Sequence, residues 1–174
     1  MTTKKENWKQ TTLGEVVEFQ RGFDLPKKDR VDGSFALITS SGQDGTHNQY
    51  KVKAPGVVIG RSGTLGQVHF IKQDFWPLNT TLWVKNFHGN DERFLFYLLE
   101  TLSLEKYNAG SGVPTLNRNH IHPLELSVPN IAEQKSIAAI LSSLDDKIEL
   151  LRAQNKTLEE IAQRLFKEWF VDFN

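Results

Sequence analysis

The chain has 174 residues, 39% of them hydrophobic, with 21 basic and 21 acidic side chains, so its formal net charge is zero. This length is sufficient to bury one sizeable core. The sequence contains neither an apolar run of about 18 residues, as a membrane span requires, nor the apolar segment of a signal peptide after Met1. Because Cys is absent, disulfides, thiolate metal sites and a cysteine nucleophile are excluded. We expect a soluble, cytoplasmic protein.

The part of the chain before residue 130 predicts an α+β fold rich in short strands. Segments of β-branched and aromatic residues, separated by turns containing Gly, Ser, Asp, Asn or Pro, are expected to form these strands. The segments are residues 12–19, 35–39, 56–60, 67–71, 80–84 and 124–128. One helix is predicted from Asp91 to about Tyr107, because apolar side chains recur there at helical spacing. This apolar face consists of Phe94, Leu95, Leu98, Leu99 and Leu102.

The charges are unevenly distributed along the chain. Residues 21–72 hold eight basic and four acidic side chains, an excess of +4, whereas residues 131–174 hold six basic and eight acidic ones, a net charge of −2. Basic patches attract phosphate groups. The N-terminal part is therefore the one expected to meet a nucleic acid, although the zero net charge gives no such argument for the chain as a whole.

Two patterns are similar to ligand sites but favour simpler interpretations. Gly60, Gly63 and Gly66 are evenly spaced, as in loops that cradle phosphate, but the spacing is a weak signal and favours a tight turn between two strands. His120 and His122 would begin a metal site, yet without Cys we interpret them as surface or core histidines. The motifs of phosphate-binding loops, nucleophile elbows and dinucleotide-binding folds are absent.

A long amphipathic segment near the C-terminus predicts a helical arm. Its apolar residues recur at alternating spacings of four and three, the heptad pattern of a coiled coil. The members of this heptad seam are Ile137, Leu141, Leu144, Ile148, Leu151, Asn155, Leu158, Ala162, Leu165 and Trp169. Asn130 is expected to cap the helix, with the Glu133 side chain reaching back to the Asn130 amide. We therefore divide the chain into a domain over residues 1–129 and an arm over residues 130–174, with the helix ending near residue 171.

The seam favours an antiparallel pair of helices. Heptad positions a are Leu141, Ile148, Asn155, Ala162 and Trp169, and positions d are Ile137, Leu144, Leu151, Leu158 and Leu165. In an antiparallel homodimer each a residue faces a d residue of the partner, so that Ile137 meets Trp169 and Leu144 meets Ala162 around a two-fold axis near Ala153. A parallel dimer would stack Asn155 on Asn155, which can fix register. That alternative stays open.

Several motifs, taken in chain order, resemble the specificity (S) subunits of type I restriction-modification systems. They are Leu13-Gly14-Glu15, the Gly60-Arg61-Ser62-Gly63-Thr64-Leu65-Gly66 loop, the Gly110-Ser111-Gly112-Val113-Pro114-Thr115-Leu116 turn, Pro129 followed by Glu133-Gln134, Ile137 and Leu141, and the segment Leu165-Phe166-Lys167-Glu168-Trp169-Phe170. The resemblance covers essentially the whole chain. A full S subunit has two target-recognition domains and two such helices, whereas this sequence has one of each. The resemblance implies a half-length S subunit or a fragment of a full one.

The resemblance also implies a protein that recognises DNA sequence and catalyses no reaction itself. In such systems methyltransferase subunits dock along the S subunit and modify adenine, and restriction/translocase subunits complete the complex. S-adenosylmethionine, ATP and Mg would be bound by these partner subunits, and this chain would carry no cofactor. Residues 1–129 would be the target-recognition domain. The arm over residues 130–174 would pair two chains, dock the methyltransferase, and place the two domains on an inverted, bipartite site of double-stranded DNA.

Polar residues in predicted loops are the candidates for DNA contacts. Arg61 is the candidate for guanine O6 and N7, because it lies between glycines in an expected protruding loop with Ser62 and Thr64 nearby. Lys27, Lys28 and Arg30 are expected to hold the phosphate backbone without reading sequence. Two further clusters consist of Ser40, Ser41 and Gln43, and of Asn79, Thr80 and Thr81.

Two other classes of function stay open from the residues alone. One is an interaction module whose arm binds a partner helix while its domain never touches DNA. The other is an unrecognised hydrolase that uses the histidines. Sequence-dependent DNA binding in the presence of methyltransferase subunits distinguishes DNA recognition from the first alternative, and turnover by the isolated chain would support the second.

Overall fold

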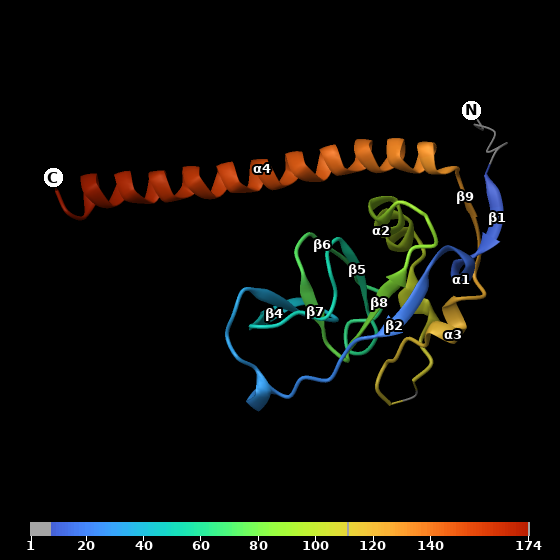
Figure 1. Ribbon diagram of the computed structural model, residues 1–174. Coiled ribbons are helices and arrows are strands. Elements are labelled where there is room, and N and C mark those ends of the chain that lie inside the picture. Colours follow the sequence, from blue (N-terminus) through green and yellow to red (C-terminus); the bar gives the residue numbers. More distant parts are fainter. Residues whose placement is uncertain (1–7, 111, 174) are drawn as a thin grey trace. The chain divides into compact units, whose positions relative to one another are not determined.

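The computed structural model describes residues 8–110 and 112–173. The chain divides into two compact units, Met1–Ser136 and Ile137–Asn174. The first unit is mixed α+β and rich in short strands, and the second consists mainly of the long helix α4 (Ile131–Phe170), which begins within the first unit (Figure 1). None of the described helices combines the length and the apolar character that a membrane span needs.

Short strands in the described part of the first unit form three small sheets. The four-stranded antiparallel sheet has the order β2 (Glu18–Arg21), β8 (Thr81–Asn86), β5 (Gly56–Gly60), β6 (Val68–Ile71). The three-stranded sheet has the order β4 (Gly42–His47), β3 (Phe35–Thr39), β7 (Phe75–Pro77), and its β3 and β7 are parallel. The third sheet pairs β1 (Lys9–Thr12) with β9 (Glu125–Val128), so that Lys9 lies opposite Val128.

The three-stranded sheet contributes to two apolar clusters. Consecutive side chains of a strand point to opposite faces. Ile38 of β3 and Phe75 of β7 accordingly belong to one buried cluster with Val58 of the central strand β5. Their neighbours Leu37 and Trp76 belong to the other cluster, together with Leu78. Apolar side chains thus pack against both faces of this small sheet, and this packing stabilises its short strands.

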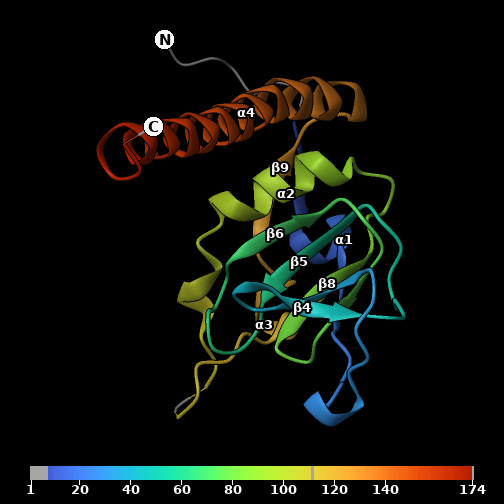
Figure 2. The ribbon, with the colours of Figure 1, turned by 90° about the vertical axis from the view of Figure 1, so that its left-hand side faces the viewer.

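Helix α2 (Glu92–Thr101) covers β5 and β6 of the four-stranded sheet (Figure 2). The Asp91 carboxylate accepts a hydrogen bond of 2.9 Å from the Phe94 amide and caps the helix. Phe94, Leu95 and Leu99 are buried, as the predicted apolar face requires. The helix is shorter than predicted, because Ser103 adopts a left-handed φ of +48° and a separate 3-10 helix η2 (Leu104–Tyr107) follows.

The single strand predicted over residues 12–19 is wrong. The structure replaces its centre with one helical turn, α1 (Leu13–Val16), between β1 and β2. Leu13, Val16 and Val17 are all buried. Spacings of three and four residues bring such side chains to one face of a helical turn, whereas a strand would turn Val16 away from the other two.

Five short elements escaped the sequence analysis. They are strands β1, β4 and β7, the 3-10 helix η1 (Lys27–Asp29), and helix α3 (Arg118–Ile121). Strand β4 carries few apolar side chains, and its Gly42 and Gly45 have positive φ angles of +113° and +86°. Strand β7 ends in Pro77, a residue that weakens a strand prediction. These elements are held by their neighbours in space, which local sequence does not reveal.

The first turn of α4 is fastened to the rest of the first unit by polar side chains. Of the two predicted capping contacts, the one made by the Asn130 side chain is confirmed. Asn130 Oδ1 accepts a hydrogen bond of 3.0 Å from the Glu133 amide. The Glu133 carboxylate, however, accepts from Trp8 Nε1 at 3.0 Å, instead of reaching back to Asn130.

Gln134 is almost fully buried, and its Nε2 donates to Asn90 Oδ1 at 2.8 Å and to the Pro129 carbonyl at 3.0 Å. Gln134 Oε1 accepts from the Asp91 amide at 2.9 Å.

We predict that Gln134→Leu lowers the free energy of unfolding by about 1–3 kcal/mol, because the substitution leaves buried polar partners of the amide without hydrogen bonds. The exposed Gln73 provides the matched control, and Gln73→Leu should change stability by less than about 0.5 kcal/mol. Urea unfolding of wild type and both variants at one protein concentration measures the difference. Equal stability of Gln134→Leu and wild type would show that the three hydrogen bonds contribute nothing net.

Candidate nucleic-acid interface

The glycine-rich segment forms the turn between β5 and β6, as predicted. The Gly60 amide donates to the Gln67 carbonyl at 2.8 Å, and the Gly66 amide donates to the Gly60 carbonyl at 2.9 Å. A Cβ atom at Gly60 would lie 1.9 Å from the Thr64 carbonyl oxygen, so a side chain has no space there. Gly63 and Gly66 have φ angles of +86° and +73°, which glycine adopts without strain. The glycines are thus explained by a tight turn.

Arg61, at the start of this turn, is half-buried. Its amide donates to the Thr80 carbonyl at 2.8 Å, and its Nη1 lies 3.5 Å from the Asn79 carbonyl oxygen. The Ser62 amide also donates to the Thr80 carbonyl, at 3.1 Å. The structure therefore brings Arg61 and Ser62 together with the Asn79–Thr81 cluster, while Thr64 is exposed in the same turn.

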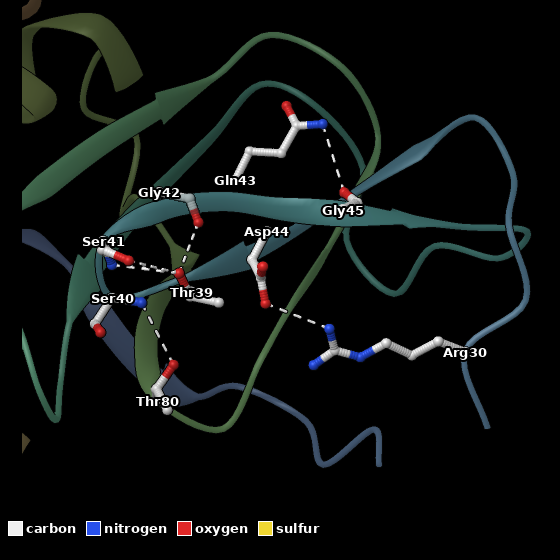
Figure 3. A network of polar contacts seen from close by, with 9 residues as sticks. All are labelled: Arg30, Thr39, Ser40, Ser41, Gly42, Gln43, Asp44, Gly45 and Thr80. Carbon is white, nitrogen blue, oxygen red and sulfur yellow. Dashed lines mark hydrogen bonds and ion pairs between the residues drawn. The ribbon is translucent and has the colours of Figure 1, made fainter. Parts of the chain in front are cut away.

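The second polar cluster lies on the hairpin of β3 and β4 (Figure 3). The Ser40 amide donates to Thr80 Oγ1 at 3.3 Å, which joins this cluster to the Asn79–Thr81 segment. Thr39 Oγ1 donates to the Gly42 carbonyl at 2.8 Å and lies 3.1 Å from Ser41 Oγ. Gln43 is exposed, and its Nε2 is 3.5 Å from the Gly45 carbonyl oxygen. Three groups that the sequence analysis named separately are thus neighbours.

Two of the named residues are enclosed by the fold. Thr81 is fully buried, and its hydroxyl donates to the Leu78 carbonyl at 2.7 Å. Ser40 is 7% exposed, and its carbonyl oxygen lies 3.3 Å from His69 Nε2. The Thr81 hydroxyl and the Ser40 backbone thus contribute to the support of the loops. A direct DNA contact by either side chain would require β8 or the β3–β4 hairpin to move.

The predicted backbone-binding residues differ in their surroundings. Lys27 and Lys28 are exposed on η1. Arg30 is more enclosed, and its Nη1 lies 3.4 Å from Asp44 Oδ2 on β4, which ties the η1 loop to the hairpin (Figure 3). Because the Asp44 side chain is exposed, solvent weakens the attraction of this ion pair. Arg30 therefore supports the loop that carries the two lysines.

The sequence analysis missed Arg21 and Arg118. Both line, with Arg61, a cavity of about 760 Å³ between β2, the turn after β5 and the segment before α3. Arg118 Nη1 donates to the Phe19 carbonyl at 3.0 Å, although the two residues lie 99 positions apart in sequence. No local motif signals this meeting, because it depends on α3 packing beside β2.

His122, which follows α3, lies next to this arginine group. Its ring stacks on Phe19 with the ring centres 5.9 Å apart, and its buried Nε2 has no hydrogen-bond partner. Burial lowers the pKa of His122, and the nearby Arg118 charge lowers it further, while Glu18 raises it. His120 is exposed on α3. Among residues 8–110 and 112–173, no group of three His, Asp or Glu side chains is placed to hold a metal ion.

The second unit exposes much of the heptad seam. Leu144, Ile148, Leu151, Leu158, Leu165 and Trp169 are exposed by between 42% and 65%. The remaining seam residues are Ile137 and Leu141, which are half-buried, and Asn155 and Ala162, which are exposed. Outside the seam, Phe166 and Phe170 stack with ring centres 5.0 Å apart.

Residues 5–160 match the family of the type I restriction modification DNA specificity domain, and the chain belongs to this family. The MjaIX specificity subunit of Methanocaldococcus jannaschii is 38% identical over 104 residues, which are 56% of this chain and 24% of that protein. A putative type I specificity subunit of Mycoplasma pneumoniae is 28% identical over 174 residues, which are 92% of this chain and 46% of that protein.

A solved structure supports the fold. The type I restriction-modification S subunit from M. genitalium superimposes with a TM-score of 0.83 at 17% identity, over 100% of this chain and 48% of that one. The α+β fold with a long C-terminal helix is therefore confirmed. In each of these three comparisons the chain matches less than half the length of its relative.

We predict that Arg118→Gln raises the pKa of His122, because the substitution removes a positive charge that disfavours protonation. The shift is measurable by following the His122 ring signal in an NMR titration, with His122→Asn identifying the signal. Because folding favours the neutral ring, its contribution to stability is complete above the unfolded-state pKa of about 6.5 and is lost as pH falls toward the lower folded-state pKa. An unchanged His122 pKa in Arg118→Gln would contradict this electrostatic coupling.

Proposed function

We propose that the chain is the sequence-specific DNA-recognition subunit of a type I restriction-modification system. Two copies recognise an inverted, bipartite site and direct adenine methylation or restriction by partner subunits. The observation that carries this proposal is the match of residues 5–160 to the DNA specificity family. The chain itself is not an enzyme. S-adenosylmethionine, ATP and Mg belong to the methyltransferase and restriction/translocase subunits, and the place of action is the cytoplasm, where those subunits meet the DNA.

The two parts of the chain have different tasks in this proposal. Residues 1–129 form the target-recognition domain, and residues 130–174 pair two chains and dock the methyltransferase subunits. The charge distribution supports the division, since residues 21–72 carry an excess of +4 and residues 131–174 a net charge of −2. Phosphates dominate the affinity of DNA-binding proteins, so the first part is the better DNA surface.

The candidate residues in the loops divide into two groups, those that contact the phosphate backbone and those that contact bases. Lys27 and Lys28 are exposed cations that hold the backbone without distinguishing bases. Arg61 is the base-reading candidate, because a guanidinium can bond guanine O6 and N7 together. The other exposed or half-buried candidates belong to the same turn or to the two polar clusters that Thr80 joins to it. They are Ser41, Gln43, Ser62, Thr64 and Asn79.

We predict that the chain, combined with the methyltransferase encoded beside it, methylates adenine at one bipartite motif. Arg61→Ala should relax one base position of this motif at a cost of about 1–3 kcal/mol in binding, because one bidentate contact is lost. Genome-wide mapping of methylated adenines in cells that express the pair checks both outcomes.

The double variant Lys27→Ala, Lys28→Ala is the matched comparison for Arg61→Ala. It should weaken methylation at every site without changing the motif. A motif that is equally sharp in wild type and Arg61→Ala would remove the base-reading role of Arg61. Complete absence of methylation with the wild-type pair would count against DNA recognition itself and favour an interaction module.

The dimer proposal rests on the exposed seam of the second unit. Solvent-exposed apolar residues at heptad spacing are stable in water when a second helix covers them. Antiparallel pairing uses the complete seam, places Leu144 against Ala162 of the partner subunit, and orients two recognition domains by a two-fold axis. An isologous dimer of this kind matches the symmetry of an inverted site.

We predict that wild type is a dimer at micromolar concentration and that Leu151→Asp combined with Leu158→Asp is a monomer, because the charges would be buried in the pair. Sedimentation measures both masses. A wild-type mass of one chain would exclude self-association through the seam.

Crosslinking tests the polarity of the same dimer, because the chain has no cysteine. Leu141→Cys and Leu165→Cys are prepared separately, mixed, allowed to exchange subunits and oxidised. Antiparallel pairing should give disulfides mainly between the two different variants. Efficient crosslinking of each variant with itself would establish the parallel arrangement.

A further inference from the structure

The arginine-lined cavity of the first unit has a wall built from four separate parts of the chain. They are β2 with the residues that follow it, the turn after β5, Leu82 of β8, and Ala109 together with residues 115–118. The lining residues that matter here are Arg21, Arg61, Arg118, Gly22 and Asn117. The volume of about 760 Å³ is ample for an ionic group of a larger ligand.

Positive charge dominates this cavity. The described lining includes three arginines and contains neither Asp nor Glu. Three guanidinium groups around one cavity repel each other, and this repulsion is relieved when an anion enters. Guanidinium groups also match the geometry of phosphate oxygens, to which they can donate two parallel hydrogen bonds.

The internal partners of the arginines leave capacity for a ligand. Arg118 donates to the neutral Phe19 carbonyl at 3.0 Å, and Arg61 Nη1 lies 3.5 Å from the neutral Asn79 carbonyl. A guanidinium has five N–H donors, so one such bond orients the group and leaves its other donors available to a ligand. Arg21 lies 3.6 Å from Asp24, but both side chains of this pair are more than half exposed, and solvent weakens their attraction.

The wall of the cavity is held in place by backbone and side-chain hydrogen bonds. The Leu116 amide donates to the Arg61 carbonyl at 2.7 Å, which joins the segment before α3 to the turn after β5. Asn108 Oδ1 accepts from the amides of Gly110 and Thr115, each at 2.9 Å, and so holds these two residues close to each other. The arginines are therefore presented by a preformed site, which reduces the entropy cost of binding.

We propose that this cavity is an anion site that receives a phosphate of the DNA backbone, with Arg21 and Arg118 as its principal ligands. The proposal rests on the proposed DNA-recognition function and adds two phosphate-binding residues to it. Arg61, on the same wall, is then held next to the duplex by a contact that is independent of base sequence. The phosphate fixes register, and the neighbouring side chains can distinguish bases.

Salt dependence of DNA binding tests the site directly. The full chain is titrated against a duplex of random sequence over a range of salt concentrations, as wild type, Arg21→Gln, Arg118→Gln and the double variant. Each lost phosphate contact should reduce the slope of log K against log salt by about 0.9. Arg164→Gln, which removes one exposed positive charge from α4, is the control and should leave the slope unchanged. Arg118→Lys keeps the charge and should keep most of the slope.

A second measurement separates a DNA phosphate from a free phosphate ion. Inorganic phosphate or the duplex is added while the His122 ring signal is titrated by NMR. An anion beside Arg118 should raise the pKa of His122 in wild type and should have a much smaller effect in Arg118→Gln. A response to inorganic phosphate without any change of DNA salt slope in the variants would overturn the assignment to the DNA backbone.

The outcomes also distinguish a failure of the proposed phosphate site from a failure of the proposed DNA-recognition function. If wild type binds duplexes and neither Arg21→Gln nor Arg118→Gln changes the slope, the phosphate site is wrong and DNA recognition stands. If wild type in complex with its methyltransferase binds no duplex at all, the proposed function fails first. Because Arg21 is exposed at the end of β2, its variant remains informative if Arg118→Gln unfolds.

Discussion

The buried amide of Gln134 is the interaction on which the assembly of the first unit depends most directly. It joins the first turn of α4 to the end of β9 through Pro129 and to the start of α2 through Asp91. The bond to Asn90 extends this network, because Asn90 Nδ2 donates to the Val16 carbonyl at 3.1 Å and to the Phe87 carbonyl at 2.9 Å. The side chains of Gln134 and Asn90 thus connect the starts of α4 and α2 with the end of α1, and each polar atom of the buried Gln134 amide is satisfied, as burial requires.

The electrostatics of the domain work through local clusters and not through net charge. An exposed ion pair such as Arg21–Asp24 contributes at most about 1 kcal/mol. An arginine in such a pair can exchange its carboxylate for a phosphate at little cost. In the proposed function, the excess positive charge of residues 21–72 would then be available to the phosphate backbone of DNA. A local excess of this kind would let a protein of zero net charge bind a polyanion.

Sequence patterns predicted the regular parts of the structure well. The Asn130 cap and the heptads together predicted the two ends of helix α4 to within one residue, and the apolar runs predicted the bounds of β3 and β5. Local patterns failed where neighbours in space decide the conformation. Strand β4 is polar and glycine-containing, yet it pairs with β3, and the apolar residues around Leu13 form a helical turn instead of a strand.

The candidate site was predictable in its loops but not in its composition. Arg61 stood out because glycines flank its turn, whereas Arg21 and Arg118 carry no local signal. They reach one cavity because β2 and α3 lie side by side in the fold, which only long-range packing establishes. The sequence also did not predict which polar side chains are buried. Thr81 belongs to a polar cluster and is nevertheless fully buried.

The pairing of β1 with β9 places the first and last strands of the first unit next to each other, with Lys9 opposite Val128 and Thr12 opposite Glu125. A domain whose ends meet can be inserted or exchanged without disturbing the chain on either side. Recombination between related genes at these two strands would replace the loops between them as a cassette and preserve the helix that follows. In the proposed function, such an exchange would change the target specificity in one genetic step.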